Sequence, residues 1–346
     1  MMIIYIIFIL AFSLNAQGQS YQIYLEADKQ AAAGNYETAF QLIEDQKETD
    51  QCRVLGYYWS WVALYSDTRN SLTVQFPSGS SSKNVLGTTF TYKFKNSEAL
   101  GALLNTGCSS NGNLSKAAGI LSWELLENYK TSALSKRIEL GYLKKDVELE
   151  KLEEAYQEKF LNLSDKAGSH FKKALQLGVY DSITTFGLAN SLEYQSKYRE
   201  AIRYYKKAYA LNSNYYLALL KTAACFGKTG DWDSCSVYAQ KVIFRSDEES
   251  ELAVAHRLQA EAFWYGQKNK KKAKKSYKKA NKLDAGEYDN SISYIGFLQE
   301  SGKHKKAMKQ AIKFLKNNKD NSHIYSGLSF IFKDKEMGKI IKKASD

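Results

Sequence analysis

The chain has 346 residues, 44% of them hydrophobic, so it is long enough to bury a sizeable core and too apolar to be disordered throughout. It contains a single proline, Pro77, and residues 114 to 346 are rich in Ala, Leu, Lys, Glu and Tyr. This composition favours long helices and argues against a mainly β protein. The net charge of +12 is uneven, because residues 266 to 346 carry 21 Lys or Arg against 8 Asp or Glu, whereas residues 1 to 265 carry 28 against 29.

The first segment, residues 1 to 14 (MMIIYIIFILAFSL), is an apolar run followed by small and amide residues. It is shorter than the roughly 20 residues that cross a bilayer, but it suits the apolar part of an export signal. We therefore predict a cleaved signal peptide over residues 1 to 18 and an exported protein, either periplasmic or secreted. An uncleaved N-terminal membrane anchor is the alternative, because no Lys or Arg precedes the run.

Two further segments precede the regular part of the chain. Residues 19 to 66 contain AAAGNYETAFQLI (31 to 43), which indicates a turn followed by a helix. Residues 67 to 113 are rich in Ser, Gly, Thr and Asn, and two β-prone runs, 72 to 76 and 89 to 94, are expected to pair as a small β-hairpin. This insertion is either a recognition loop or a surface excursion. Residues 97 to 107 and 114 to 130 resemble a degenerate helix pair, and we assign 114 to 147 to degenerate helices.

From residue 148 to 346 the sequence repeats with a period of roughly 34 residues. Ala174 and Ala208 are one period apart, as are Ala167 and Ala201, and the period continues after a four-residue insertion in RSDEESE. In each copy three small or apolar residues stand at i, i+4 and i+7, which places them on one stripe of a helix. These expected packing residues are Ala167, Phe171, Ala174, Ala201, Tyr205, Ala208, Cys235, Ala239, Val242, Ala273, Tyr277, Ala280, Ala307, Ala311 and Phe314. A second apolar segment ended by Gly or polar residues precedes each set, so the unit is helix, turn, helix.

This pattern resembles the tetratricopeptide repeat (TPR) family. In residues 182 to 215, Leu188 and Ala189 stand where the family has Leu-Gly, with Ala201, Tyr205 and Ala208 at its small, aromatic and second small positions. The family's final Pro is replaced by Ser213. The resemblance covers residues 20 to 53 and 148 to 346, which is about two thirds of the chain. It implies an all-α solenoid of helix hairpins with a basic C-terminal quarter, in which the paired lysines of each second helix lie on a solvated convex face.

The resemblance also implies where a partner binds. The first helices of TPR hairpins line the concave face, and here they supply Ile183, Phe186, Asn190, Leu217, Leu220 and Ala224. Only Asn190 matches the Lys and Asn clamp with which some family members hold acidic peptide tails. The apolar character of the others favours a helical or hydrophobic peptide as partner.

The sequence offers no set of residues for catalysis, a cofactor or a metal site, because the four histidines lie far apart and no nucleophile motif is present. Cys225 and Cys235 lie on the two helices of one hairpin, and we expect either a disulfide or two buried free thiols. Nucleic-acid binding is not expected, because Arg, the preferred base reader, is absent after Arg257.

We therefore expect a non-catalytic protein that binds a protein or peptide as a scaffold of the cell envelope. The alternative is a peripheral protein that binds anionic lipid or polymer through its lysine-rich C-terminal repeats. A third hypothesis, an enzyme that uses residues 67 to 113, would be removed if deletion of this insertion left function intact.

Overall fold

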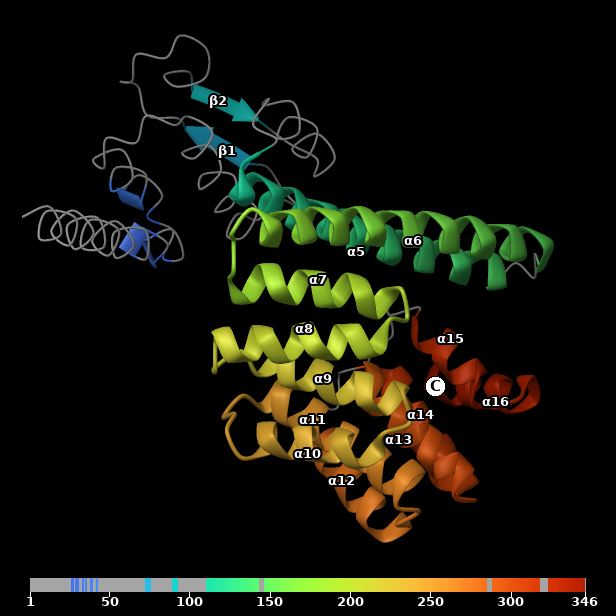
Figure 1. Cartoon of the computed structure of the whole chain (residues 1–346). Coiled ribbons are helices and arrows are strands. Elements are labelled where there is room, and N and C mark those ends of the chain that lie inside the picture. Colours follow the sequence, from blue (N-terminus) through green and yellow to red (C-terminus); the bar gives the residue numbers. More distant parts are fainter. Residues whose placement is uncertain are drawn as a thin grey trace, which may run out of the picture. The chain divides into compact units, whose positions relative to one another are not determined.

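The structure is a computed structural model of the whole chain (Figure 1). It describes residues 110 to 142, 146 to 284, 288 to 317 and 323 to 345, two short strands, and a few positions between 26 and 42. The predicted signal peptide, most of residues 19 to 66, and the helix expected over 97 to 107 lie outside the described residues. Within the described part, no helix is both long and apolar enough to cross a membrane.

The two strands pair as expected. β1 (Leu72–Gln75) runs antiparallel to β2 (Thr89–Tyr92), with Leu72 opposite Tyr92 and Gln75 opposite Thr89. The β-prone runs thus pair, as predicted, while the residues that connect them lie outside the described part of the chain.

Two long helices follow, α5 (Gly112–Tyr142) and α6 (Asp146–Gln176). The chain divides into two compact units that both include parts of these helices: residues 1 to 125 with 169 to 180, and residues 126 to 168 with 181 to 346. In the first unit, a Cβ on Gly119 would lie 2.8 Å from the Phe171 ring, so a glycine is needed where α5 meets α6. In the second, Ser164 of α6 donates a hydrogen bond to the carbonyl oxygen of Ser191 (3.2 Å), and the Phe160 and Tyr194 rings meet edge to face.

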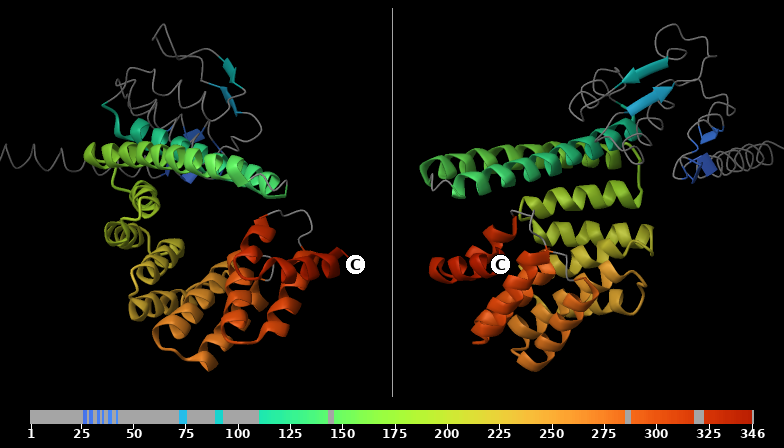
Figure 2. Two further views of the ribbon diagram at one scale, coloured as in Figure 1. Left: turned by 90° about the vertical axis from the view of Figure 1, so that its right-hand side faces the viewer. Right: turned by 180° about the vertical axis from the view of Figure 1, so that it is seen from behind.

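The rest of the second unit is a series of helix hairpins, in which neighbouring helices pack on one another (Figure 1, Figure 2). The all-α solenoid of TPR-type hairpins is thereby confirmed. Its helices are α7 (Ser182–Tyr194), α8 (Tyr198–Leu211), α9 (Tyr216–Lys228), α10 (Trp232–Ile243), α11 (Glu249–Glu261) with the π-helical turn η1 (Ala262–Gly266), α12 (Lys270–Leu283), α13 (Tyr288–Glu300), α14 (His304–Asn317), α15 (His323–Ser329) and α16 (Asp334–Ser345).

The repeated stripe forms the core. All fifteen packing residues named from the repeat period are buried, none more than 5% exposed. The lysine pairs that accompany them, such as Lys206 and Lys207 on α8, are exposed. Alanine lets neighbouring helices approach closely, and the aromatic ring fills the space between them; Tyr277, for example, lies 5.0 Å from the ring of Phe297 on α13.

The turns inside the hairpins repeat with the same period. Ser196, Gly230, Lys268 and Gly302 all have positive φ, between 51° and 79°, and they are one repeat apart once the four-residue insertion is allowed for. In three of these turns the next residue donates a backbone hydrogen bond five residues back, from Lys197 to Leu192, Asp231 to Phe226 and Lys303 to Leu298. In the third hairpin the bond runs six residues back, from Asn269 to Phe263, because η1 adds a residue to the helix end.

Candidate functional site

The structure places the six residues expected on the concave face in different environments. Phe186 lies between the rings of Tyr205 and Tyr215, at 5.1 and 4.8 Å, and Asn190 is buried against Tyr205. Leu220 belongs to a buried cluster with Ala239 and Leu258. These three side chains face neighbouring helices in the packed interior, and they therefore hold those helices together. Ile183 and Ala224 are half-buried, and Leu217 is 41% exposed.

Charged and aromatic side chains lie on the same first helices and were not anticipated from the sequence. Together with the predicted Leu217 they form what we call the first-helix surface: Glu193, Leu217, Lys221, Arg257, Glu261, Trp264, Tyr265 and Glu300. They come from α7, α9, α11, η1 and α13, and both α9 and α13 pack against α11.

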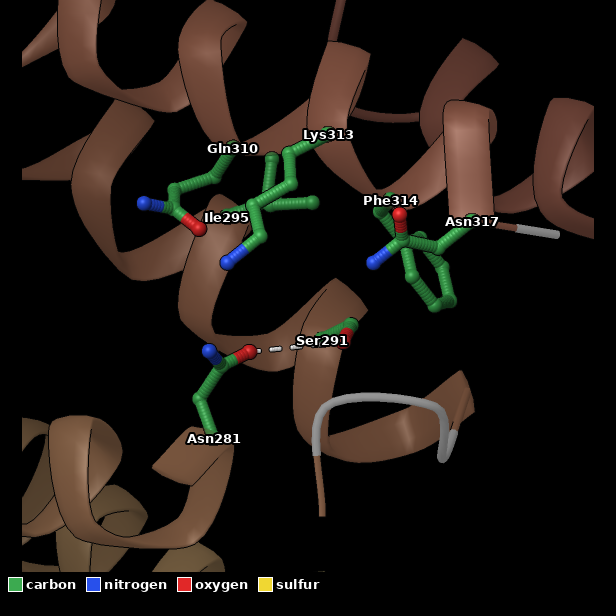
Figure 3. Close-up of a pocket in the computed structure, with 7 residues that line it drawn as sticks. All are labelled: Asn281, Ser291, Ile295, Gln310, Lys313, Phe314 and Asn317. Atoms are coloured by element: carbon green, nitrogen blue, oxygen red, sulfur yellow. Dashed lines mark hydrogen bonds between the residues drawn. The ribbon is translucent and has the colours of Figure 1, made fainter. Parts of the chain in front are cut away.

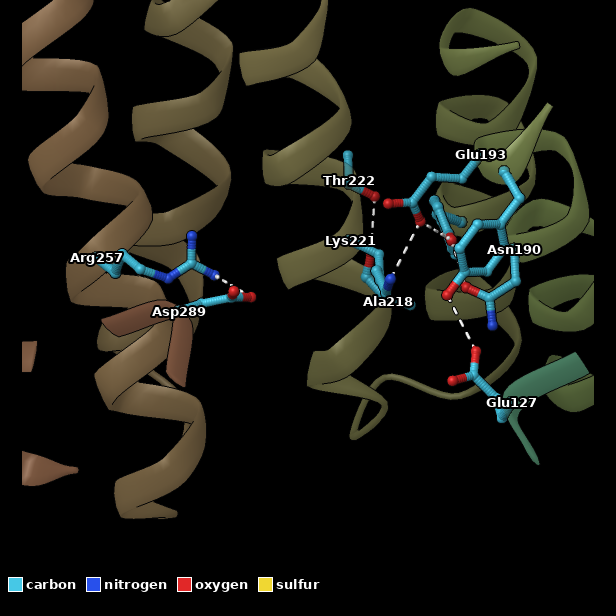
Figure 4. Close-up of polar contacts among 10 residues, drawn as sticks. Glu127, Asn190, Glu193, Ala218, Lys221, Thr222, Arg257 and Asp289 are labelled. Carbon is cyan, nitrogen blue, oxygen red and sulfur yellow. Dashed lines mark hydrogen bonds and ion pairs between the residues drawn. The ribbon is translucent and has the colours of Figure 1, made fainter. Parts of the chain in front are cut away.

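A first group joins α7 to α9 (Figure 4). Lys221 donates to Glu193 Oε2 at 3.2 Å, and the Tyr205 hydroxyl approaches the same oxygen at 2.5 Å. That hydroxyl also lies 2.5 Å from the side-chain oxygen of Asn190, and because it has one proton it donates to only one of these two acceptor oxygens at a time. Burial, followed by the Glu193 carboxylate, raises the pKa of Tyr205 far above its usual value. The tyrosine therefore stays neutral and acts as a structural link.

A second group joins α11 to α13. Arg257 is 15% exposed and contacts Glu261 at 2.9 Å, Asn290 at 3.2 Å and Asp289 at 4.0 Å. Figure 4 shows its guanidinium directed at Asp289. Ser293 of α13 also donates to Glu261 (3.3 Å). Because the two carboxylates and the amide surround one cation, Arg257 is held in a single orientation.

A third group lies where η1 meets the end of α13. Trp264 Nε1 donates to Glu300 Oε2 at 2.7 Å, and the Tyr265 hydroxyl approaches the same carboxylate at 3.3 Å. Burial and Glu300 raise the pKa of Tyr265 to about 12. Trp232 packs beside Tyr265, and a Cβ on Gly266 would collide with the Trp232 Cβ, so only glycine fits there. Tyr265 nevertheless remains 40% exposed.

The described residues also form a small hollow between α12, α13 and α14 (Figure 3). It is lined by Asn281, Ser291, Ile295, Gln310, Lys313, Phe314 and Asn317. Its volume of about 10 Å³ is room for a single water. This hollow is too small for an organic ligand. In the described part of the chain, no three His, Cys, Asp or Glu side chains converge as a metal site requires.

The two cysteines of the second hairpin are free thiols, so no disulfide joins them. The physical reason is that they face different neighbours. Cys225 lies towards Glu193 and Tyr205 of the preceding hairpin, whereas Cys235 Sγ lies 3.7 Å from the carbonyl oxygen of Leu258 on α11. Burial raises the pKa of both thiols to about 12.

No protein-family model matches the chain, and no curated protein matches its sequence. Solved structures are similar to part of the chain. MamA from residue 41 onwards, from Desulfovibrio magneticus RS-1, is 18% identical, covering 49% of this chain and 97% of that one, with a TM-score of 0.39. The TPR protein TTC0263 of Thermus thermophilus is 14% identical over 61% and 97% of the two chains, TM-score 0.40. PilW, a type IV pilus biogenesis factor, is 18% identical over 63% and 98%, TM-score 0.42.

The repeated hairpins, their shared turn geometry and their buried stripe define the class of this protein: it is an α-solenoid built of TPR-type repeats.

Proposed function

We propose that the chain is a non-catalytic interaction scaffold that binds a peptide or protein segment across the first-helix surface. The observation that carries this proposal is the fixed arrangement of that surface. Contacts between helices hold Glu193 to Lys221, Arg257 to Asp289, and Trp264 to Glu300, so the charged and aromatic groups are preorganised. A preorganised surface binds with less loss of side-chain entropy.

The chemistry of the surface indicates the kind of partner. Leu217 and Tyr265 offer exposed apolar area, while Lys221 and Arg257 alternate with carboxylates along the stack. An extended or helical segment with apolar anchors and charges of both signs fits such a surface better than a uniformly acidic tail. The apolar run at residues 1 to 14 supports the further proposal that this binding takes place outside the cytoplasm, in the cell envelope.

Site-specific photo-crosslinking tests the proposal. A photoreactive amino acid is placed at Leu217 or Tyr265 on the first-helix surface, and at Val237 or Phe244 as matched controls. The controls are exposed apolar positions on or directly after the second helix α10, 54% and 79% exposed. After irradiation in native extract and washing at high salt, we expect one discrete protein on positions 217 and 265 and none on 237 and 244. Equal labelling at all four positions would contradict the assignment of the surface.

A further inference from the structure

The strongest feature outside the first-helix surface is a cluster of lysines where α12 begins and α13 turns into α14. We call Lys270, Lys274, Lys303 and Lys306 the lysine patch. Lys270 donates to the carbonyl oxygen of Ser301 at 2.7 Å, which ties the start of α12 to the turn before α14. Among the other three ammonium groups, that of Lys274 acts most strongly on Lys303. Four like charges thus meet on one small surface.

This arrangement is unfavourable for the folded chain by itself. Helix N-termini carry partial positive charge and are stabilised by acidic residues, as Glu200 stabilises α8 and Asp233 stabilises α10. The first turns of α12 and α14 contain no acidic residue and carry lysines instead, Lys270 in α12 and Lys305 and Lys306 in α14. Desolvation, followed by the charges of Lys274, Lys270 and Lys306, lowers the pKa of Lys303. The nearby Glu300 is engaged by Trp264 and Tyr265. An external anion would relieve this repulsion.

We propose that the lysine patch docks the solenoid onto a bilayer surface that bears anionic phospholipid headgroups. Lysine ammonium groups are compact point charges that bind phosphate without needing a fixed approach angle, as a fluid headgroup layer requires. Nucleic acid suits the patch less well. No arginine follows Arg257 to read bases. This inference is independent of the proposed peptide-binding function, since it uses other residues.

Vesicle co-sedimentation of the full chain tests the docking. Binding is compared on phosphatidylcholine vesicles and on vesicles in which phosphatidylglycerol replaces a third of the lipid, in buffer of low ionic strength and at 1 M salt. Any contribution of the apolar residues 1 to 14 is common to both vesicle types, so the ratio of the two partition coefficients isolates the charge-dependent part. We expect a strong anionic preference that is lost at 1 M salt, where the screening length falls to about 3 Å.

Two variants with the same net charge then distinguish a specific patch from general basicity. In the first, Lys270, Lys274, Lys303 and Lys306 are changed to Gln; in the control, the exposed Lys172, Lys173, Lys207 and Lys228 are changed to Gln. Each lysine at an anionic surface contributes about fivefold to partitioning. We therefore expect the patch variant to lower the anionic preference at least about fiftyfold, and the control by less than about fivefold.

The patch variant is also expected to melt at a higher temperature than the parent chain, because it removes repulsion at two helix N-termini; this readout shows that it is folded. Equal losses in both variants, or no anionic preference in the parent chain, would overturn the proposal. Titration with a duplex and a single-stranded oligonucleotide completes the test. If either oligonucleotide binds the parent chain more tightly than the anionic vesicles do, and this binding is lost in the patch variant, the lysine patch binds nucleic acid and the lipid assignment is wrong.

Discussion

At the scale of single residues, the repeated turn gives a direct test of backbone strain. Ser196 has a φ of 60° at the position where the next hairpin has Gly230, and residues with a Cβ adopt this conformation at a cost. We predict that Ser196→Gly stabilises the protein by about 0.5 to 1 kcal/mol, and that Gly230→Ser destabilises it by a similar amount. Urea unfolding followed by circular dichroism measures both. Changes of the same sign in the two variants would show that the turns are not equivalent.

The buried thiols give a second prediction at this scale. In a chain with Cys52 and Cys108 changed to Ser, neither Cys225 nor Cys235 should react with a thiol reagent at pH 8, because burial raises both pKa values to about 12. Both should react once the chain is unfolded in denaturant without reductant. If unfolding released no thiol, the cysteines would be joined as a disulfide.

These raised pKa values also determine how the stability of the fold changes with pH. Both thiols bind protons more tightly in the folded than in the unfolded chain, whose cysteines titrate near about 8.5. Their contribution to stability is therefore complete below that pH and is lost as the pH rises towards 12. Replacing Cys235 with Ala should flatten the fall in unfolding free energy between pH 9 and 11, which urea titrations at each pH measure.

At the scale of the helix, an N-terminal cap fixes where α10, the second helix of its hairpin, begins. The Asp231 carboxylate accepts a hydrogen bond from the Ser234 amide (3.0 Å) at the start of α10, and this bond lowers the pKa of Asp231. We predict that Asp231→Ala costs about 1 kcal/mol at pH 7. Because the pKa of Asp231 is lower in the folded than in the unfolded chain, the cap stabilises the fold at any pH above the unfolded pKa. This stabilisation is lost as the pH falls through the folded pKa. The difference between parent and variant should therefore shrink at pH 3, whereas Asp231→Asn should stay close to the parent at pH 7.

The helices also show which features of the fold and of the candidate site could be predicted from the sequence alone. The buried stripe was predictable because Ala201, Tyr205 and Ala208 recur with one period, and every copy must pack against a neighbour in the same way. The first-helix surface had no such signal. Glu193 and Lys221 are separated by less than one repeat, so they occupy different positions of the period. They meet because α7 and α9 both pack on α8. Phe186 and Leu220 were expected on the binding surface but are buried. Their apolar character alone did not reveal which face of the helix a neighbouring helix covers.

At the scale of the whole molecule, hairpins that contact only their neighbours should lose structure locally when one is damaged. α16 packs on α14, with Ile340 fully buried in a cluster that includes Phe314 and Leu315. A carboxylate at this position has no partner to compensate its burial, so Ile340→Asp should destabilise the last hairpins by more than about 3 kcal/mol. The neighbouring and exposed Lys339→Asp serves as the matched control, with an expected effect within about 0.5 kcal/mol.

Hydrogen exchange read by mass spectrometry shows how far this damage travels. In Ile340→Asp, the backbone amides of α13 to α16 should exchange faster, because their shared core is opened. The amides of α7 to α9 should keep their protection, because the buried cluster around Leu219 and Ala239 does not include α14 or α16. Loss of protection in α7 as well would mean that the stack unfolds as one cooperative block. The lysine patch and the first-helix surface could not then be altered separately, since each would depend on every hairpin between them.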